Sequence, residues 1–579
     1  MEQQQPQLQR FRLACLVGGL VLTLWTSPCH AVWDGPLNKP ITWASNNWSR
    51  FDRFLATFDP AGRYVRQPIE RQIPALTFKG FYRQWTDVLL SSERTIRNRK
   101  KDFRFLQLQS LLEIEMHYQV SPNIEITNIN HFLYDGAYNW QDSSGLYANR
   151  RSETSRAYHN LDRIVRELYI SYRTHNLDVV VGKQQIAWGK MDGRFIDTIN
   201  AIDNREGAQS EAAEYEFRRL PVFMLNTTYF FGANSLNFLY IPHFEQDRSA
   251  GFGSPWAVPF LPPGGEDLLT SDRDVLLGRK DFAGNYILKR RRPSSGNWSD
   301  HEYGVRLDVS MEPLTWGLVY YYAWNKSAQN FITDRAIDEN GEVHLILQPR
   351  HTRLHHFGIT ADYATSFSNI PLVGELPMVL RVEGLWTKAV EFADTDRFAA
   401  AANLPNPDFV IASNASAKDV RRTVSARRWA GRGESFASGG HVSRDTFRAA
   451  LALEFALPGN TSFIFQPSLF YTFDWRETLG GGFGGGVGDE WNVLPVVFVG
   501  RPFRFTRDRL NIGFTAIPWI SGPNRKWQGI KTRLVATYNF SQFITGRLTY
   551  TAFSGGYGSD IYGLYGNYDN IGWELSYEF

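Results

Sequence analysis

The amino-acid sequence predicts an all-β fold, a transmembrane antiparallel β-barrel with long extracellular loops. Three observations support this prediction. The chain starts with an export signal, many short segments alternate between apolar and polar side chains, and aromatic residues make up 15% of the 579 residues. After the export signal, no apolar run approaches the ~20 residues that a membrane helix requires. Exported, aromatic-rich chains of short alternating segments are typical of outer-membrane barrels.

The first 31 residues have the features of a secretory signal peptide. Arg10 and Arg12 precede an apolar run, Leu13–Trp25, that is too short to span a bilayer, and a small-residue exit follows. Basic, apolar and small residues in this order indicate cleavage after residue 31. A lipoprotein site at Cys29 is the alternative, which the residues before that cysteine fit poorly.

The composition of the mature chain excludes several classes of function. Both cysteines, Cys15 and Cys29, lie in the signal peptide, so no thiol remains for disulfides, thiolate metal sites or cysteine nucleophiles. The whole chain has 62 basic and 59 acidic residues, and without Arg10, Arg12 and Glu2 the mature chain has 60 and 58. This balance gives no overall basic field that would bind nucleic acid.

Alternation of apolar and polar residues is the main signal for strands. From Leu106 to Val120 the even positions are mostly apolar and the odd positions mostly polar, and the segment EYGVRLDVSM at 302–311 alternates in the same way. Because side chains along a strand point alternately to opposite faces, each segment has one face suited to oil and one to water.

Short turns join these segments into hairpins. Examples are 121–123, 174–176, 232–234 and 458–460. Long polar stretches separate the hairpins, at about 135–165, 188–220, 243–300, 325–352, 389–445, 474–492 and 553–570. The strict alternation of short and long connections predicts tight periplasmic turns and long outer loops.

The barrel is expected to occupy residues 73–579 with about eighteen strands, or sixteen if 73–90 and 492–500 are not strands. An even count places both termini in the periplasm. Residues 32–72 are then a periplasmic extension, a plug or a simple tether, with a short amphipathic helix starting at Ser45 or Asn46.

The final strand must pair with the first, because every backbone polar group in a bilayer needs a partner. Alternate residues of GWELSYEF are apolar and are expected to face lipid. The same aromatic strand resembles the C-terminal signal that the barrel assembly machinery recognises. The residues expected to form this signal are Trp573, Leu575, Tyr577 and Phe579.

No catalytic constellation is recognisable, so the sequence predicts neither an enzyme nor a cofactor nor a metal site. Five histidines lie on or beside strands without a partnered serine and carboxylate: His117, His131, His301, His355 and His356. The glycine-rich stretch 479–490 lacks the following helix and the Lys-Ser/Thr pair of a nucleotide loop, and is interpreted as an outer loop.

Charged residues on the predicted inner faces are the main candidates for function. Lipid-facing charges near the midplane cost roughly 2–4 kcal/mol each, so these residues are expected to face a wet or internally paired lumen. Two readings stay open: ion pairs that brace the wall, and charged rows that select solutes in a pore. The residues are Glu113, Glu115, Arg306, Asp308, Arg381, Glu383, Arg448, Glu454, Arg533, Arg547, Glu574 and Glu578.

Two basic clusters in the long loops are candidates for contact with lipopolysaccharide, because arginine suits phosphate. Solvated loop charge and, for 389–445, an inward loop that narrows the pore are the alternatives. The arginines are Arg290, Arg291, Arg292, Arg421, Arg422, Arg427 and Arg428.

The stretch VVVGKQQIAWGKMDGRFIDTINAIDNREG at 179–207 resembles a family of large proteobacterial outer-membrane proteins known only as a domain of unknown function. The matching positions are Gly182, Lys183, Gln184, Trp188, Gly189, Asp192, Gly193, Ile199, Asn200, Asp203, Arg205 and Glu206. The resemblance implies a porin-like barrel that is linked with periplasmic partners and envelope transporters. It implies no established substrate or catalytic residue.

Physically, this stretch leaves a strand and enters a loop dense in charged residues. We expect these residues to form a network that folds into the barrel mouth and narrows it, or else a rigid loop held by its own ion pairs. The pore candidates here are Lys183, Gln184, Asp192, Asp197, Asp203, Arg205 and Glu206.

The sequence therefore predicts a channel in the cell outer membrane, a porin-like facilitator for uptake or export of small organic solutes, amphipathic ones included. Its expected partners are outer-membrane lipid, lipopolysaccharide and the barrel assembly machinery. The alternatives are a structural barrel that sheathes a periplasmic or envelope-transport partner, an outer-membrane hydrolase and a surface receptor. The sequence identifies neither the solute nor the oligomeric state.

Overall fold

The computed structural model describes residues 57–90, 105–138, 164–189, 191, 196–204, 215–249, 286–370, 374–403, 408–412, 415, 417–429, 439–480, 489–523, 526–555, 562, 565 and 568–579. The predicted signal peptide, the helix expected at Ser45 or Asn46 and most of the glycine-rich stretch 479–490 lie outside the described residues.

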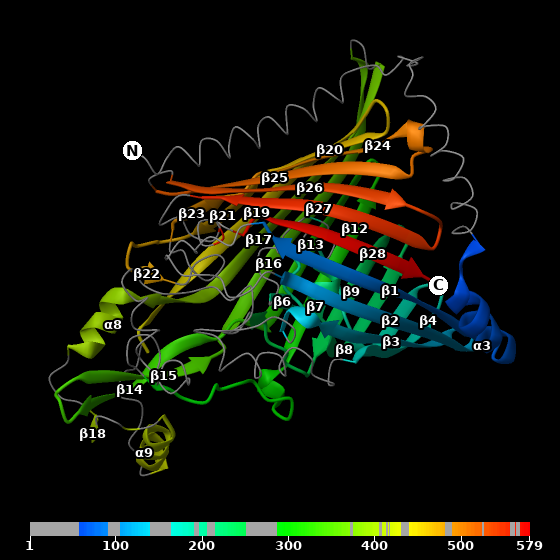
Figure 1. Ribbon diagram of the computed structural model, residues 1–579. Coiled ribbons are helices and arrows are strands. Elements are labelled where there is room, and N and C mark those ends of the chain that lie inside the picture. The colour runs from blue at the N-terminus through cyan, green and yellow to red at the C-terminus, as the bar shows by residue number, and fades with distance from the viewer. Residues whose placement is uncertain are drawn as a thin grey trace.

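Eighteen antiparallel strand positions form one closed barrel within the described part of the chain (Figure 1). Neighbours in the ring follow chain order, and the last strand pairs with the first. In ring order the strands are β1 (Leu76–Leu89), β2 (Phe105–Ser121), β3 (Ile124–Asp135), β4 (Val165–Arg173), β5 (Leu177–Gln184), β8 (Val222–Phe231), β9 (Asn234–Ile241), β12 (Glu302–Met311), β13 (Leu314–Trp324), β16 (Arg353–Ile370), β17 (Gly374–Asp394), β19 (His441–Leu457), β20 (Thr461–Gln466) with β21 (Ser468–Thr472), β23 (Trp491–Val493) with β24 (Val496–Pro502), β25 (Leu510–Ser521), β26 (Lys526–Asn539), β27 (Ile544–Ser554) and β28 (Asn570–Glu578).

Two ring positions are each shared by two short strands. Pro467 separates β20 from β21, and Pro495 lies between β23 and β24. Proline has no N–H to donate, so it interrupts the ladder of hydrogen bonds. The predicted count of eighteen is confirmed over the alternative of sixteen, because residues 73–90 and 492–500 both supply strands.

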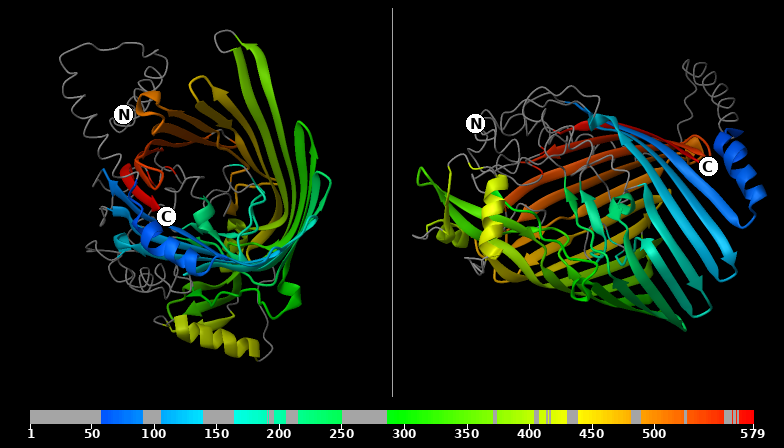
Figure 2. Two further views of the ribbon diagram at one scale, coloured as in Figure 1. Left: turned by 90° about the vertical axis from the view of Figure 1, so that its right-hand side faces the viewer. Right: turned by 90° about the horizontal axis from the view of Figure 1, so that it is seen from below.

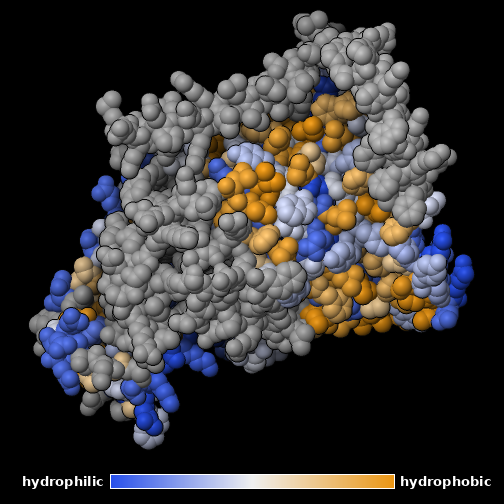
Figure 3. Space-filling view, in the orientation of Figure 1, coloured by the Kyte–Doolittle hydropathy of each residue, from blue (hydrophilic) through white to orange (hydrophobic). Residues whose placement is uncertain are grey.

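Strand register assigns every second side chain to the outer face of the barrel. Tyr82 of β1 pairs with Leu112 of β2 and with Tyr577 of β28, and Trp573 and Leu575 follow on the same face. Trp573 and Leu575 are about half exposed, 48% and 52%. Figure 3 shows apolar residues gathered on this wall. The predicted alternation of faces is therefore present in the last strand.

The two ends of the barrel differ. At the end near the C-terminus, β12 and β13 are joined by two residues and β4 and β5 by three, as predicted. The long connections gather at the opposite end, except that β25 and β26 are joined there by residues 522–525 alone. The prediction that short and long connections alternate strictly is wrong at this one place.

Three stretches predicted as long loops, 243–300, 325–352 and 389–445, together contain a sheet of their own, which we call the rim sheet. It comprises β11 (Tyr286–Ile287), β15 (Val343–Arg350), β14 (Gln329–Asp338) and β18 (Phe409–Ile411). The helices α8 (Thr395–Ala402) and α9 (Ala417–Trp429) pack on it through Ala401, Val420 and Val424. Asp394 caps α8 by accepting the N–H of Asp396 and of Arg397.

A short helical segment lies at the other end of the barrel, beside the C-terminus (Figures 1 and 2). It comprises η2 (Gly62–Arg66) and α3 (Gln67–Gln72). The Ala61 N–H donates to the Tyr577 hydroxyl at 2.9 Å, and that hydroxyl donates to Asp59 at 2.8 Å. The described end of the predicted 32–72 extension is therefore fastened to the last strand. Among the described residues, no helix has the length and apolar character needed to cross a membrane.

Candidate functional site

One segment between β5 and β8 enters the interior of the barrel (Figure 2). We call it the Trp188 segment, and it is described at residues 185–189, 191 and 196–204. Trp188, Ile196 and Ile199 are almost fully buried. They pack against inward side chains of four strands, β8, β9, β13 and β17, namely Val222, Met224, Leu239, Ile241, Val319, Tyr321, Ala323 and Leu385.

The Trp188 side chain packs against the inner wall of the barrel. Its ring meets that of Tyr321 edge-on, with centroids 6.3 Å apart, and its Nε1 donates to Asn237 Oδ1 at 3.3 Å. A Cβ added at Gly304 would lie 2.7 Å from the indole. The absence of a side chain at Gly304 therefore makes room for the indole.

Charged side chains hold the backbone of the same segment. Arg306 donates from Nη1 to the Trp188 carbonyl, while its Nε and Nη2 bind both oxygens of Asp308 at 2.7 Å. The Met191 N–H donates to Glu383 Oε1 at 3.3 Å. Met191 itself packs against Ala450, Ala452 and Phe470 on β19 and β21. The segment thus reaches from β5 to the wall formed by β17–β21.

The last part of the Trp188 segment is tied to the rim. Asn200 accepts the Ile186 N–H and donates to the Leu220 carbonyl, each at 3.0 Å. Asp197 pairs with Arg219 at 2.7 Å. β6 (Ala201–Asn204) then joins β7 (Arg219–Leu220) and β10 (Arg248–Ser249) in a small sheet, and α5 (Tyr215–Arg218) precedes β7. These contacts fix where the segment enters the barrel.

The pore candidates predicted in residues 179–207 lie in different environments. Gln184 and Asp197 are buried, and Asp203 lies in β6. Register pairs Lys183 with Leu168 and Phe223, two exposed outward residues, so Lys183 starts from the outer face and not from the pore side where it was predicted. Because the strand ends at Gln184 and a loop follows, the sequence did not show which face of the sheet Lys183 takes. Asp192, Arg205 and Glu206 lie outside the described residues.

Other predicted charges line the inner face as ion pairs. Arg381 lies between Asp362, at 3.5 Å, and Glu454. Arg547 binds Glu574 at 3.1 Å. The other residues placed on this face by register are Glu113, which contacts His131, Glu115, which is opposite Lys79, Arg448, which is opposite Leu385 and Phe470, Arg533, which is opposite Thr515, and Glu578, which is opposite Phe81.

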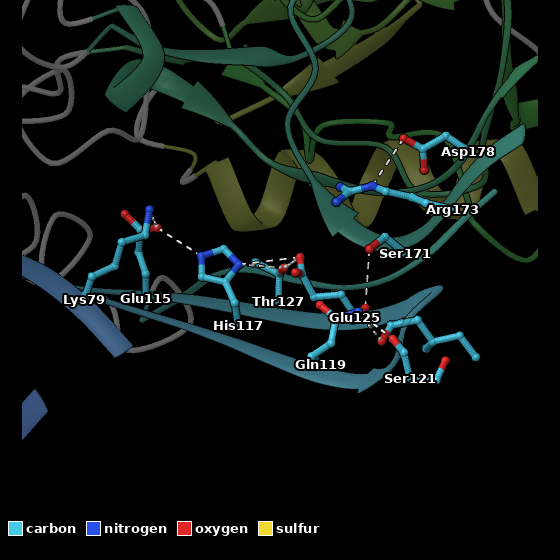
Figure 4. A network of polar contacts seen from close by, with 11 residues as sticks. Lys79, Glu115, His117, Gln119, Ser121, Glu125, Thr127, Ser171, Arg173 and Asp178 are labelled. Carbon is cyan, nitrogen blue, oxygen red and sulfur yellow. Dashed lines mark hydrogen bonds and ion pairs between the residues drawn. The ribbon is translucent and has the colours of Figure 1, made fainter. Parts of the chain in front are cut away.

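A second polar network lines β1 to β5 toward the short-turn end (Figure 4). Lys79 binds Glu115 at 2.7 Å, and His117 Nε2 lies 3.3 Å from the same carboxylate. Thr127 lies 3.2 Å from His117 Nδ1 and donates to Glu125 at 3.3 Å. Thr127 is buried, whereas Lys79, Glu115, His117 and Glu125 are partly exposed and give the inner wall a row of groups that water can solvate.

Another segment, after β27, also packs inward. We call Tyr562, Tyr565 and Tyr568 the tyrosine segment. The ring of Tyr562 meets Trp519 of β25 edge-on at 5.7 Å, and that of Tyr565 lies 5.8 Å from Phe553 of β27. Burial raises the pKa of the Tyr562 and Tyr565 hydroxyls well above the usual value, so both stay neutral. The sequence indicated only a polar loop here.

Several functional contacts were missed by sequence reasoning. Tyr321 and Asn237 contact the Trp188 segment, but both are far from it in sequence and lie on strands of ordinary alternation. The inward parity of Asn237 within SLNFLY was the only available signal. Trp188 and Asn200 were recognised only as positions of the family resemblance.

The basic clusters separate into exposed and engaged arginines. Arg291 and Arg292 are exposed, and so are Arg421 and Arg422 on α9. Arg290 is exposed too and donates to Gln246 at 2.5 Å. Arg427 instead turns toward the rim sheet, where it donates to the Asp408 carbonyl and lies 3.8 Å from Asp334. The Arg428 side chain lies outside the described residues.

One group of residues in the described part of the chain could hold a cation. The ligand atoms of Asp338, Glu342 and His344, at the β14–β15 turn, lie within 4.8 Å of one another. The Asp338 carboxylate already accepts the N–H of Asn340 and of Glu342, both at 2.9 Å. The turn itself accounts for its position.

The model of a family described as "Protein of unknown function (DUF1302)" matches residues 97–579, and the chain belongs to this family. The resemblance inferred from 179–207 is confirmed. No curated protein matches the chain.

Solved structures with a similar fold are porins. The outer membrane protein opdK from Pseudomonas aeruginosa is 8% identical, with 88% of this chain and 99% of that chain covered and a TM-score of 0.42. A BenF-like porin from Pseudomonas fluorescens Pf-5 is 9% identical, with 88% and 99% covered and a TM-score of 0.43.

Proposed function

We propose that this protein is an outer-membrane channel, a porin-like facilitator for small organic solutes, amphipathic ones included. The observation that carries the proposal is the opposite polarity of the two faces of one wall. Outward positions such as Leu575 and Trp573 are apolar and exposed. Inward positions hold ion pairs such as Arg547–Glu574 and Arg381–Asp362.

Physical chemistry favours a wet interior for such a barrel. A closed ring leaves no unpaired strand edge, which makes it one of the few folds that can span a bilayer. Because a lipid-facing charge costs roughly 2–4 kcal/mol, the charged face must be the inner one. A ring of this size can enclose an aqueous channel. The Trp188 segment would narrow that channel.

The solute class is proposed from the chemistry that meets at the Trp188 segment. The aromatic rings of Trp188 and Tyr321 lie beside the Arg306–Asp308 ion pair and near Glu383. Trp188, Tyr321 and Glu383 are almost fully buried, so the groups open to the polar part of an amphipathic solute are the partly exposed Asp308 and, along the same inner wall, Arg381 and Glu454. The direction of transport, uptake or export, is not distinguished by these contacts.

Conductance of purified protein in planar bilayers tests the proposal. We expect discrete current steps, and changes of current when organic acids, amines and neutral aromatic solutes are added in turn. Absence of conductance, together with stable copurification of a periplasmic protein, would contradict the channel and favour a structural barrel that sheathes a partner.

A further inference from the structure

Three basic side chains, two of them cationic at neutral pH, lie on the outer wall of the barrel, where β13, β16 and β17 approach the rim sheet. Register pairs Arg353 with Trp324, and His355 with both Tyr322 and Lys388. We call Arg353, His355 and Lys388 the wall patch. None of the loop arginines singled out in the sequence belongs to it.

The wall patch is on the outward face, as the next pairs along the same strands show. Phe357 pairs with Tyr320 and Trp386, and Ile359 pairs with Leu318. All five side chains are more than a third exposed. From the rim end inward, the outer face therefore carries cations, then aromatic rings, then aliphatic side chains.

This order matches the cross-section of one bilayer leaflet. Aromatic side chains of membrane barrels lie at the interface, and aliphatic ones at hydrocarbon depth. The wall patch lies one step above the aromatic row, which is the level of the lipid headgroups. Anionic headgroups attract cations there.

In the described part of the chain, no carboxylate contacts the wall patch directly, although Asp300 and Glu302 act on Arg353 at longer range and its Nη2 donates to the Ser299 carbonyl. Within the described residues, no carboxylate forms an ion pair with Arg353, His355 or Lys388. The guanidinium of Arg353 lies over Trp324 and Tyr322, 4.1 and 4.6 Å from the ring centroids. These rings hold the charge at the surface without neutralising it.

Two details aim the patch outward. His355 Nδ1 lies 3.0 Å from the Tyr320 hydroxyl, which orients the imidazole. Lys388 is exposed and precedes a break in the β17–β19 register, where Ala389 has a φ of 67°. The Ala389 N–H donates to Asp445 at 3.1 Å and fixes this bulge. Bulges are a common means of re-aiming a side chain.

We propose that the wall patch binds a phosphorylated glycolipid of the outer leaflet through its phosphate. Lys388 contacts the phosphate directly, Arg353 supplies charge beside it, and the aromatic row packs along the acyl chains. The assignment to the outer leaflet rests on the proposed outer-membrane function, because that function places the rim sheet outside the cell.

The test titrates the full-length protein in non-ionic detergent with bisphosphorylated lipid A and follows binding by native mass spectrometry. We expect the double variant R353Q/K388Q to bind roughly 25-fold more weakly, since each cation near a membrane surface contributes about 1 kcal/mol. The matched control is R63Q/R71Q, which removes two exposed arginines at the opposite end of the barrel and should bind within about twofold of the natural protein. The α9 variant R421Q/R422Q tests the loop arginines as the competing site.

Three outcomes would overturn the proposal. The first is that dephosphorylated lipid A binds as tightly as bisphosphorylated lipid A, and the second is that inorganic phosphate does. The third is that R421Q/R422Q loses lipid A binding while R353Q/K388Q keeps it. The heat-induced shift of barrel mobility in electrophoresis checks folding, and K388Q alone replaces the double variant if that one fails to fold.

Conductance in phosphatidylcholine bilayers, which contain no lipid A, separates this proposal from the channel. The wall variant should conduct like the natural protein. A natural protein that binds lipid A without conducting would contradict the channel alone. A conducting protein whose lipid A binding ignores R353Q/K388Q would contradict the wall patch alone.

Discussion

The Trp188 segment and the tyrosine segment both pack against the inner wall, yet different interactions hold them. Trp188 has an apolar seat, and charged groups of Arg306 and Glu383 also bind the backbone around it. Tyr562 and Tyr565 meet Trp519 and Phe553 mainly through ring contacts. The Trp188 segment is held by apolar packing and by charged side chains, whereas the tyrosine segment is held mainly by apolar packing. We therefore expect only the first to affect ion selectivity.

Removing the indole should have the largest effect. Trp188→Ala removes the buried ring and leaves a cavity, which destabilises the packing of the Trp188 segment by about 3–5 kcal/mol. The segment should leave the wall, and single-channel conductance should rise. Trp429→Ala, which removes an indole of α9 that is 93% exposed, is the control and should leave the conductance unchanged. Unchanged conductance in W188A would show that this segment does not narrow the path.

Removing the charge that binds the segment should come next. Arg306→Gln takes the donor from the Trp188 carbonyl and leaves Asp308 without its partner. Hydrogen bonds to charged groups contribute about 1.5–3 kcal/mol each. We expect selectivity to shift toward cations, measured as the reversal potential in a salt gradient. Arg422→Gln on α9 is the control, and an equal shift there would contradict a local effect.

Crowding the seat should have a smaller effect. Gly304→Ala adds a Cβ 2.7 Å from the indole, and such overpacking typically costs about 1–3 kcal/mol. We expect faster hydrogen exchange at residues 196–204. In Gly384→Ala the added Cβ meets nothing closer than 3.4 Å, so that control should exchange normally. Identical hydrogen exchange in G304A and G384A would contradict the close contact between the Trp188 indole and Gly304.

The tyrosine segment should tolerate loss of a hydroxyl. Tyr562→Phe keeps the ring contacts with Trp519 and Phe553, so we expect less than about 1 kcal/mol of change in thermal stability. Reversal potential should be the same in Y562F and in the natural protein. Tyr562→Ala, which removes the ring, should lower stability by more. A shift of selectivity in Y562F would give this segment the electrostatic role assigned to the Trp188 segment.

Acid should loosen only the rim beside the Trp188 segment. Burial lowers the pKa of His351 to about 4, and its ring packs edge-on against Phe244. The unfolded imidazole titrates near 6.5, so between these values the unfolded state binds more protons. Stability of this rim therefore falls as pH drops from 6.5 to 4 and levels off below. Hydrogen exchange at residues 242–249, corrected for intrinsic rates, should show the change, and His351→Gln should abolish it.

Much of the barrel could be predicted because its signal is local. Alternation in residues 106–120 and in the last strand assigned their faces, and short turns assigned hairpins. The same parity placed Arg306, Glu383 and Arg547 on the inner face. Lys183 was chosen for its charge alone, and the register places it on the outer face that it shares with the exposed Val181.

The candidate site was predictable only in part. The density of charged residues pointed to 179–207. No sequence pattern indicated that Trp188 would pack against apolar wall residues or Tyr562 against aromatic ones. Arg427 looked like its exposed neighbours, yet it faces Asp334 and Phe409. Periodicity within a loop does not tell which surface a residue will meet.

The sequence by itself determined that this chain forms a barrel with an apolar outside and a charged inside, because side-chain direction in a strand follows from a period of two. Only the tertiary structure decided that Trp188 lies against Tyr321, that Lys183 starts outward and that Arg353 and Lys388 share one patch. These neighbours are far apart in the chain or lie past a bulge, and closure of the ring brings them together.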